Sequence, residues 1–238
     1  MTEKLCPDRD VAENLAYIRE RMAKACVQAG RQENDVTLLA VTKTVEPSRI
    51  NAALRLGVGH IGENRVQEFL GKQEFLELDG VESHLIGHLQ TNKVRQIVGQ
   101  VQMIESVDSV RLAAAISRRS EELGLVTPIL VEVNIGGEEA KSGVSPAELL
   151  PLLENISILP GVSVRGLMTV PPILGSETEK RQIFSKMYRL FVDIGAKNID
   201  NIYMQELSMG MSGDYREAIL EGSTIVRIGS ALFGRRQY

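Results

Sequence analysis

The strongest constraint on the fold is a regular alternation of short apolar runs with longer segments that are apolar on one side only. Runs that are apolar at nearly every position are typical of strands buried on both faces of a parallel sheet, and one-sided helices cover such a sheet. Eight strands are therefore expected, at 37–42, 58–61, 84–86, 103–106, 128–134, 164–168, 203–207 and 224–228.

This pattern favours a closed barrel over an open sheet. Eight strand–helix units in 238 residues fit a (β/α)8 barrel better than a dinucleotide-binding sheet. The first strand-to-helix turn, Val41-Thr42-Lys43-Thr44, contains no glycine fingerprint for a dinucleotide. Barrels of this length commonly form one domain. We therefore predict an α/β protein in which residues 1–238 form a single (β/α)8 TIM-barrel domain.

The helices between the strands carry start and stop signals. An apolar stripe over 11–26 predicts the first helix, and Gly30 ends it. Proline is favoured at the first position of a helix, so Pro47 predicts a helix that starts there and runs to about residue 56. Ser145-Pro146-Ala147-Glu148 and Ser176-Glu177-Thr178-Glu179 both have the capping-box spacing, so each predicts a helix start.

Charge and hydropathy exclude several classes of protein. The formal net charge is −4, which gives no sign of a nucleic-acid partner or of a basic membrane-binding surface. No apolar run approaches the roughly 18 residues that a membrane span needs. The start, Met1-Thr2-Glu3-Lys4, lacks the apolar core of a signal peptide. We expect a cytoplasmic protein with no nucleic acid and no membrane as partner.

The two cysteines, Cys6 and Cys26, have neither metal-ligand nor CxxC spacing. We therefore expect no metal site, and we expect Cys26 to be a small core residue on the first helix.

The first strand delivers a lysine to the end of the barrel where the chemistry of such folds is found. In (β/α)8 barrels that end is formed by the loops after the carboxyl ends of the strands. Lys43 directly follows the apolar run 38–41. A lysine there cannot easily reach bulk water, so it is paired or has a lowered pKa, and either state suits an amine that forms a Schiff base. The alternative is an ion-paired lysine at the barrel rim.

Three further strand ends supply polar groups with less specific meanings. Asn64 and Thr91 follow the second and third strands, where they either line a site or cap helices. The glycine-rich loop 136–143 after the fifth strand is either flexible surface or a rim that faces an anion. Lys141 in this loop either approaches a phosphate or second anion site, or is a solvated rim charge.

The last two strands end in runs rich in glycine and serine. Ser208 and Ser212 follow the seventh strand, and Gly229 and Ser230 follow the eighth. Backbone N–H groups and hydroxyls at helix starts bind anions, and (β/α)8 barrels most often hold a phosphate at these two loops. The alternative is that Ser212 and Ser230 only cap their helices.

Arg227 is unusual because a permanent cation at an apolar barrel mouth needs an acceptor. That acceptor is either a carboxylate such as Glu206 or an atom of a ligand. The first and eighth strands are neighbours in a closed barrel, so Lys43 and the phosphate-binding turns share one mouth. An aldehyde that carries a phosphate would satisfy both, and pyridoxal 5′-phosphate is such a molecule.

A set of runs along the whole chain carries a family resemblance; they are Ala40–Thr44, Ile61–Asn64 with Gln67 and Glu68, His84–Lys93, Lys141–Gly143, Arg165–Met168, Leu207–Ser212 and Val226–Gly234. Taken together, these runs resemble the pyridoxal-phosphate homeostasis protein family. The resemblance implies a fold similar to the N-terminal barrel of alanine racemase, in the fold type III group of pyridoxal-phosphate proteins. The cofactor-binding residues that it implies are Lys43, Asn64, Ser208, Ser212, Arg227, Gly229 and Ser230.

Each of these positions has an implied role. Lys43 matches the Schiff-base lysine, Arg227 matches the arginine that meets the pyridine nitrogen, and Asn64 lies where the family lines the pocket. The phosphate-holding positions are matched by Ser208, Gly229 and Ser230, with Ser212 close by.

There are two departures from the family pattern. Thr42 stands where serine is frequent, and His60 stands where an aromatic residue is frequent. The histidine leaves the packing beneath the pocket open.

The implied site favours binding over catalysis. An arginine that faces the pyridine nitrogen disfavours its protonation, because adjacent cations repel, and this weakens the cofactor as an electron sink. A racemase also needs an acid and a base on opposite faces of the substrate. In alanine racemases a tyrosine from the partner's second domain serves one face. Since the sequence ends at Tyr238, just after the last expected helix, we expect no such domain and assign no catalytic residue.

The leading hypothesis is a binding and carrier protein that holds pyridoxal 5′-phosphate on Lys43 for intracellular homeostasis. It would buffer the cofactor or deliver it to pyridoxal-phosphate-dependent apo-enzymes, and we expect a monomer. The main alternative is a minor amino-acid racemase or decarboxylase. A third reading, a Schiff-base aldolase without cofactor, fits Lys43 but leaves Arg227 without a use.

Overall fold

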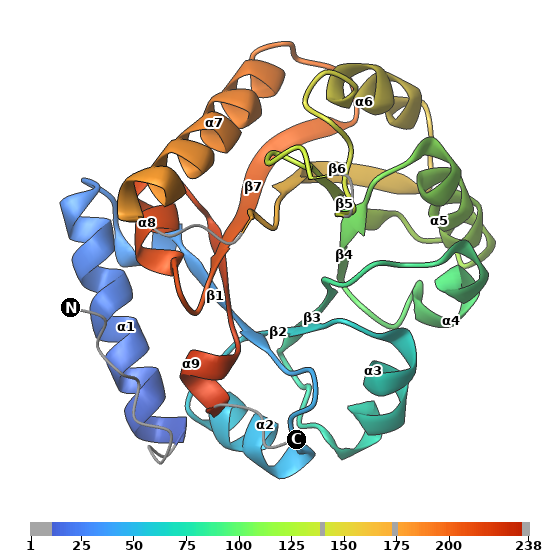
Figure 1. Ribbon diagram of the computed structural model, residues 1–238. Helices are drawn as coiled ribbons and strands as arrows, with labels where there is room; N and C mark the ends of the chain where they lie inside the picture. The colour runs from blue at the N-terminus through green and yellow to red at the C-terminus, as the bar shows by residue number, and fades with distance from the viewer. Residues whose placement is uncertain (1–10, 139–140, 173–175, 235–238) are drawn as a thin grey trace.

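Eight parallel strands form a closed barrel in chain order, with β8 hydrogen-bonded to β1 (Figure 1). The computed structural model describes residues 11–138, 141–172 and 176–234. The strands are β1 Thr37–Val41, β2 His60–Glu63, β3 Glu82–Leu85, β4 Met103–Val107, β5 Thr127–Glu132, β6 Val162–Met168, β7 Ile202–Met211 and β8 Ile225–Ile228. The expected (β/α)8 barrel is confirmed.

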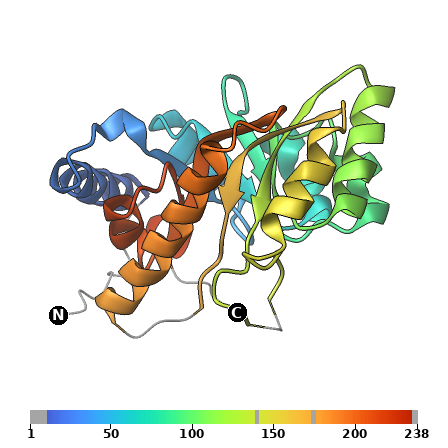
Figure 2. The ribbon, with the colours of Figure 1, turned by 90° about the horizontal axis from the view of Figure 1, so that it is seen from above.

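The helices form a ring around the strands, and a view at right angles shows them lying along the outside of the barrel (Figures 1 and 2). They are α1 Val11–Gln28, α2 Pro47–Arg55, α3 Val66–Lys72, α4 Val94–Ile97, α5 Val110–Glu122, α6 Leu149–Ser157, α7 Glu177–Gly195, α8 Tyr215–Leu220 and α9 Ser230–Phe233. Short 3-10 turns lie at Glu33–Asp35, Gln73–Phe75 and Thr91–Lys93. Helix α1 precedes the barrel and packs against α8 and α9.

Each strand buries side chains on both of its faces, which explains the nearly continuous apolar runs. One row points outward into the apolar layer beneath the helices, as Ile61, Ile104 and Ile129 do. The alternate row points into the barrel, where Leu39 and Val41 of β1 pack on β8. Successive side chains of a strand alternate between its two faces. A residue's position along the strand therefore decides whether its side chain points into the barrel or outward to the helices.

Several element boundaries differ from the sequence prediction by one or two residues, and two differ by more. Strand β7 continues to Met211, four residues beyond its expected end at 207, because Ser208 and Met211 pair with β8 on either side of a bulge. The Ser145 hydroxyl donates to the Glu148 carboxylate and does not accept from a backbone N–H, so the expected capping box is wrong and the helix begins only at Leu149. The reason is Pro151, whose ring and missing N–H are tolerated in the first turn of a helix but not five residues into one.

Other expectations about the helices hold. The Ser176 capping box is present, with Glu179 bonded back to Ser176. Cys26 is a buried residue of α1, as predicted, and its burial raises the pKa of the thiol. Cys6 lies outside the described residues.

Within the described residues no cluster of histidine, cysteine, aspartate and glutamate side chains could hold a metal ion. In the same part of the chain, no helix combines the length and the apolar character of a membrane span.

Candidate functional site

Lys43 lies at the carboxyl-end mouth of the barrel, beside the strand that carries Arg227. In the register between β1 and β8, Leu39 is opposite Arg227. Lys43 follows β1 by two residues in a turn and is half-buried. Because Leu39 and Val41 face the barrel interior, alternation along the chain puts Lys43 on the same side. The predicted neighbourhood of Lys43 and the eighth strand is therefore present.

A charge cluster of two buried residues and one half-buried residue lies outside the barrel wall, directly against the segment that carries Lys43. We call Glu63, Glu68 and Lys72 the outer cluster. The Lys72 ammonium group donates to the backbone oxygen of Thr42, at 2.8 Å, and to Glu68 Oε1, at 3.1 Å, and it forms an ion pair with Glu63. Burial raises the pKa of the Glu63 carboxyl, and Lys72 opposes that rise.

Both neighbours of Lys43 in the chain are held by the outer cluster. The Thr42 hydroxyl donates to Glu63 Oε1 at 2.9 Å, and the Thr44 N–H donates to Glu68 Oε1. Thr44 has a φ of +60°, a left-handed conformation that is costly for a β-branched residue. The outer cluster thus fixes the backbone on each side of Lys43.

The turn from β8 to α9 packs against the end of β1. Ser212 accepts hydrogen bonds from the N–H groups of Gly229 and Ala231, each at 3.2 Å. A Cβ atom at Gly229 would lie only 3.3 Å from Val41 Cβ, so glycine permits this close approach. Ser230 is exposed beside it. Ser212, Gly229 and Ser230 therefore come together after β7 and β8, and β8 adjoins the strand that leads to Lys43.

Asn64 follows β2 at the same mouth and has an open acceptor. Its Oδ1 atom is buried and has no hydrogen-bond partner among the described residues, while its backbone N–H donates to Glu63 Oε2 at 3.0 Å. The N-cap residue of α3 is Arg65 and not Asn64, so the prediction that Asn64 caps this helix is wrong. Thr91 likewise does not cap, since Gln90 holds that position.

A second buried charge cluster lies inside the barrel. We call His84, Glu105, Ser208 and Arg227 the inner cluster; each is at most 4% exposed. Arg227 donates from Nη1 to Ser208 Oγ, at 2.6 Å, and Ser208 donates to Glu105 Oε2, at 2.6 Å. The other carboxylate oxygen of Glu105 lies 2.7 Å from His84 Nδ1.

The hydrogen-bond partners of Arg227 show whether it pairs with Glu206, one of the two acceptors expected from the sequence. Its Nη2 atom donates to the backbone oxygen of Thr169 at 2.7 Å, and its link to a carboxylate runs through Ser208 to Glu105. Glu206 instead accepts from the Thr224 hydroxyl at 2.6 Å. The proposed Arg227–Glu206 pair is therefore wrong.

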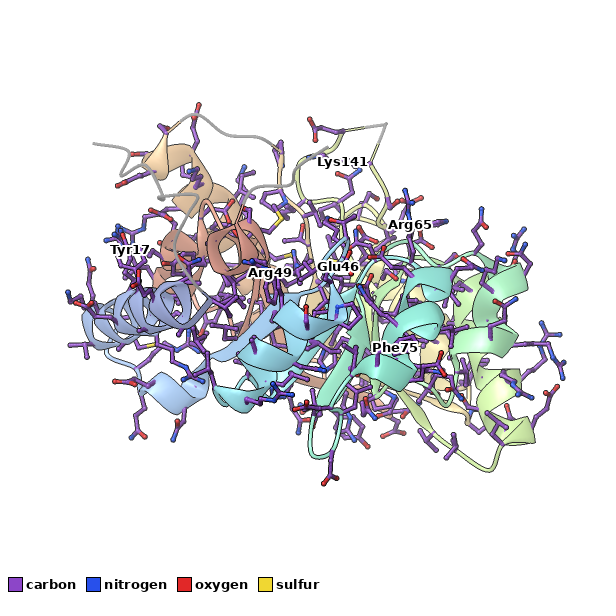
Figure 3. All side chains as sticks on the ribbon, turned by 90° about the horizontal axis from the view of Figure 1, so that it is seen from below. Tyr17, Glu46, Arg49, Arg65, Phe75 and Lys141 are labelled. Carbon is purple, nitrogen blue, oxygen red and sulfur yellow. The ribbon has the colours of Figure 1, made fainter. Side chains whose placement is uncertain are left out.

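Lys141 stands at the rim of the mouth with partners of its own. It forms an ion pair with Glu138 at 2.5 Å and donates to the backbone oxygen of Pro171 at 3.0 Å. Figure 3 shows Lys141 and Arg65 toward the same end of the molecule, with Phe75 farther toward the other end. Residues 139 and 140 of this loop lie outside the described residues, so the two readings of the loop stay open.

Sequence reasoning missed several buried charged residues. Glu105 and Glu132 lie within strands β4 and β5, and burial raises the pKa of Glu132 to about 7, with Asp108 adding to the rise and Arg227 opposing it. The available signal was a charged residue inside an otherwise apolar strand run, which requires a partner. Lys72 had no such signal, because a lysine near the end of a helix is normally exposed.

The fold and the lysine at its mouth define a barrel of the alanine racemase N-terminal type. The family model "Alanine racemase, N-terminal domain" matches residues 11–237. A pyridoxal phosphate homeostasis protein of Aquifex aeolicus is 46% identical over 229 residues, which cover 96% of this chain and 100% of that protein. The chain belongs to the pyridoxal phosphate homeostasis protein family.

Solved structures agree with this placement. PipY of Synechococcus elongatus, described with PLP bound, has a TM-score of 0.82 and 33% identity, covering 94% of this chain and 100% of its own. An alanine racemase of Clostridium difficile has a TM-score of 0.71 at 15% identity, and the match covers 96% of this chain and 57% of that one. The latter similarity shows the fold alone.

Proposed function

We propose that the chain binds pyridoxal 5′-phosphate as a Schiff base on Lys43 and takes part in intracellular homeostasis of this cofactor, with little or no catalysis of its own. The observation that carries the proposal is the packing of the Ser212–Gly229–Ser230 turn on Val41, two residues before Lys43, at one barrel mouth. The relative PipY, described with PLP bound, supports it.

Lys43 provides the amine end of the proposed site. Pyridoxal phosphate supplies an aldehyde, which condenses with an unprotonated amine with loss of one water. The outer cluster holds the backbone at Thr42 and at Thr44, so the direction of the Lys43 side chain is restricted before any ligand binds. Such preorganisation reduces the entropy lost on binding.

The phosphate end is assigned to the turns after β7 and β8. The Ser212 and Ser230 hydroxyls, and the Gly229 N–H that donates to Ser212 Oγ, are hydrogen-bonding groups of the kind that bind phosphate oxygens. Asn64 adds a buried acceptor without a partner among the described residues, which fits a hydroxyl donor of the ligand. The residues present therefore fit the cofactor at both ends.

Arg227 is assigned to the ring nitrogen. A guanidinium keeps its charge in proteins, and a cation there disfavours protonation of a neighbouring ring nitrogen. Ser208 lies behind Arg227 and is bonded to it, so we assign Ser208 to the site through that contact. This arrangement supports storage and release of the cofactor more than reactions that need a strong electron sink.

The absorbance of the purified protein tests the proposal. Wild-type protein loaded with pyridoxal phosphate should show the near-visible band of a protonated Schiff base, and Lys43→Ala should lose it. Lys24→Ala is a matched control, because Lys24 lies exposed on α1 and pairs with Glu20. A colourless wild type, or a Lys43→Ala variant with an unchanged band, would overturn the proposal.

Two further assays separate a carrier from an enzyme. Transfer of the cofactor to a pyridoxal-phosphate-dependent apo-enzyme should be faster from the loaded protein than from free solution. Sustained turnover in a racemisation or decarboxylation screen would instead favour the enzyme. Apo-enzyme recipients, a monomeric state and a cytoplasmic location stay predictions from the sequence.

A further inference from the structure

The inner cluster crosses the barrel from one wall to the other. His84 comes from β3 and Glu105 from β4, whereas Ser208 and Arg227 come from β7 and β8. Glu105 and Ser208 are 103 residues apart in sequence, and their side chains meet at 2.6 Å. The hydrogen-bonded path from His84 to Arg227 is therefore continuous through the barrel interior.

Burial makes the charges of this cluster interdependent. Glu105 is fully buried, and a buried carboxylate is stable only when it is paired and hydrogen-bonded. Burial raises the pKa of Glu105, but His84, Arg227 and Ser208 outweigh it and lower the pKa overall. Burial also lowers the pKa of His84, while Glu105 and Glu82 raise it to about 9. The Glu105 carboxylate thus stabilises the charges of both His84 and Arg227.

Other charged groups surround the two ends of the path. At the His84 end, Glu82 Oε2 lies 3.6 Å from Nε2, and the His60 ring meets the His84 ring edge-on at 5.9 Å. At the other end, the carboxylates of Asp214 and Glu132 act on Arg227 together with that of Glu105. Among these, only Glu105 is joined to Arg227 through a hydrogen bond to Ser208.

We propose that Glu105 and His84 are positioning residues for Arg227. Glu105, through the Ser208 hydroxyl, fixes the guanidinium where it meets the ring nitrogen of the bound cofactor, and His84 fixes Glu105 from the opposite side. The inference rests on the proposed function, because it assigns Arg227 to the ring nitrogen. It gives a role to the His84 run, which the sequence marked without assigning a chemical function.

The test uses pyridoxal phosphate labelled with ¹⁵N in the ring, bound to the full-length protein. Its ring-nitrogen resonance reports the hydrogen bond and protonation at that atom, and the rate of cofactor release is measured in parallel. We expect Glu105→Gln to move the resonance and to speed release about tenfold, the effect of weakening one charge-assisted hydrogen bond. Thr127→Val, which removes a buried bond to Ser120 between β5 and α5, is the matched control and should change neither.

Two variants at His84 test whether a hydrogen-bond donor at this position is enough to hold Glu105. Asn places a donor where Nδ1 stands, so His84→Asn should keep most of the wild-type resonance and release rate. His84→Leu removes the donor and should resemble Glu105→Gln. If Glu105→Gln does not fold, Ser208→Ala cuts the same path at one atom and should give the same change.

The failures of the two proposals are distinguishable. If wild-type protein binds no labelled cofactor, the proposed function fails. If wild type binds it on Lys43, and folded Glu105→Gln and Ser208→Ala leave both the resonance and the release rate unchanged, the positioning role is wrong.

Discussion

The inner and outer clusters each hold buried charged groups, yet they differ in the sign of their net charge and in the part of the chain that they fix. The inner cluster has two cations, His84 and Arg227, for one carboxylate, whereas the outer cluster has two carboxylates for Lys72. The inner cluster fixes a side chain that faces the site, and the outer cluster fixes the backbone around Lys43. The residues that define the inner cluster are thus net positive and those of the outer cluster net negative, and the carboxylates of Glu132 and Asp214 act on Arg227 as well.

The largest effect is expected when the outer cluster loses its only cation. Lys72→Met leaves Glu63, which is 1% exposed, without its counter-ion, and breaking a buried pair in this way costs about 4 kcal/mol. Urea unfolding near neutral pH measures the loss. Arg55→Met is the control, because the Arg55–Glu77 pair is exposed and its removal should change stability little. Equal, small losses in both variants would mean that the outer cluster is not structural.

The pH dependence of stability tests the charge on His84 in the inner cluster. The pKa of His84 rises from 6.5 to about 9 on folding, so the folded state holds this proton more tightly. Its contribution is fully present below the unfolded pKa and is lost as the pH rises from about 6.5 through 9, by about 3 kcal/mol. His84→Asn should flatten this slope in unfolding measurements across that range. An identical slope in the variant would contradict the charged state of His84.

Removal of the other inner cation should cost less than removal of Lys72. In Arg227→Met, Glu105 keeps its bonds to His84 and Ser208, so we expect a loss of about 2 kcal/mol, that of a charge-assisted hydrogen bond. The same variant should bind pyridoxal phosphate more weakly, as equilibrium titration would show. A stability loss larger than that of Lys72→Met would reverse the comparison between the clusters.

The smallest effect is expected at the more exposed carboxylate of the outer cluster. Glu68→Gln weakens the bonds to Lys72 and to the Thr44 N–H but leaves Glu63 in place, so about 1 kcal/mol should be lost. Since Thr44 holds a left-handed backbone, hydrogen exchange at its amide should also become faster. Unchanged exchange there would mean that Glu68 does not restrain this turn.

The sequence predicted the barrel because burial on both strand faces leaves a direct mark in the apolar runs. It also predicted that Lys43 and the last two strand ends share a mouth, because chain order fixes strand order in a closed barrel. The end of β7 was harder to predict, since serine and glycine in this run are typical of a loop, yet Ser208 and Met211 pair with β8 on either side of a bulge.

The contacts within the two clusters could not be predicted from the sequence for a different reason. Glu105 could be recognised as a buried charge in an apolar run, but its partners lie 21 and 103 residues away. Spacing along one chain says nothing about such contacts. Lys72 shows the same limit, since its contact with Thr42 joins residues 30 apart.

The most direct test of the central claim is to locate the cofactor on the chain. The loaded full-length protein is reduced with borohydride, which converts a Schiff base to a stable secondary amine, and its peptides are mapped by mass spectrometry. The account predicts the added mass on the peptide that contains Lys43, and its loss in Lys43→Ala but not in Lys24→Ala. An unmodified Lys43, with the mass on other lysines such as Lys141, would contradict it.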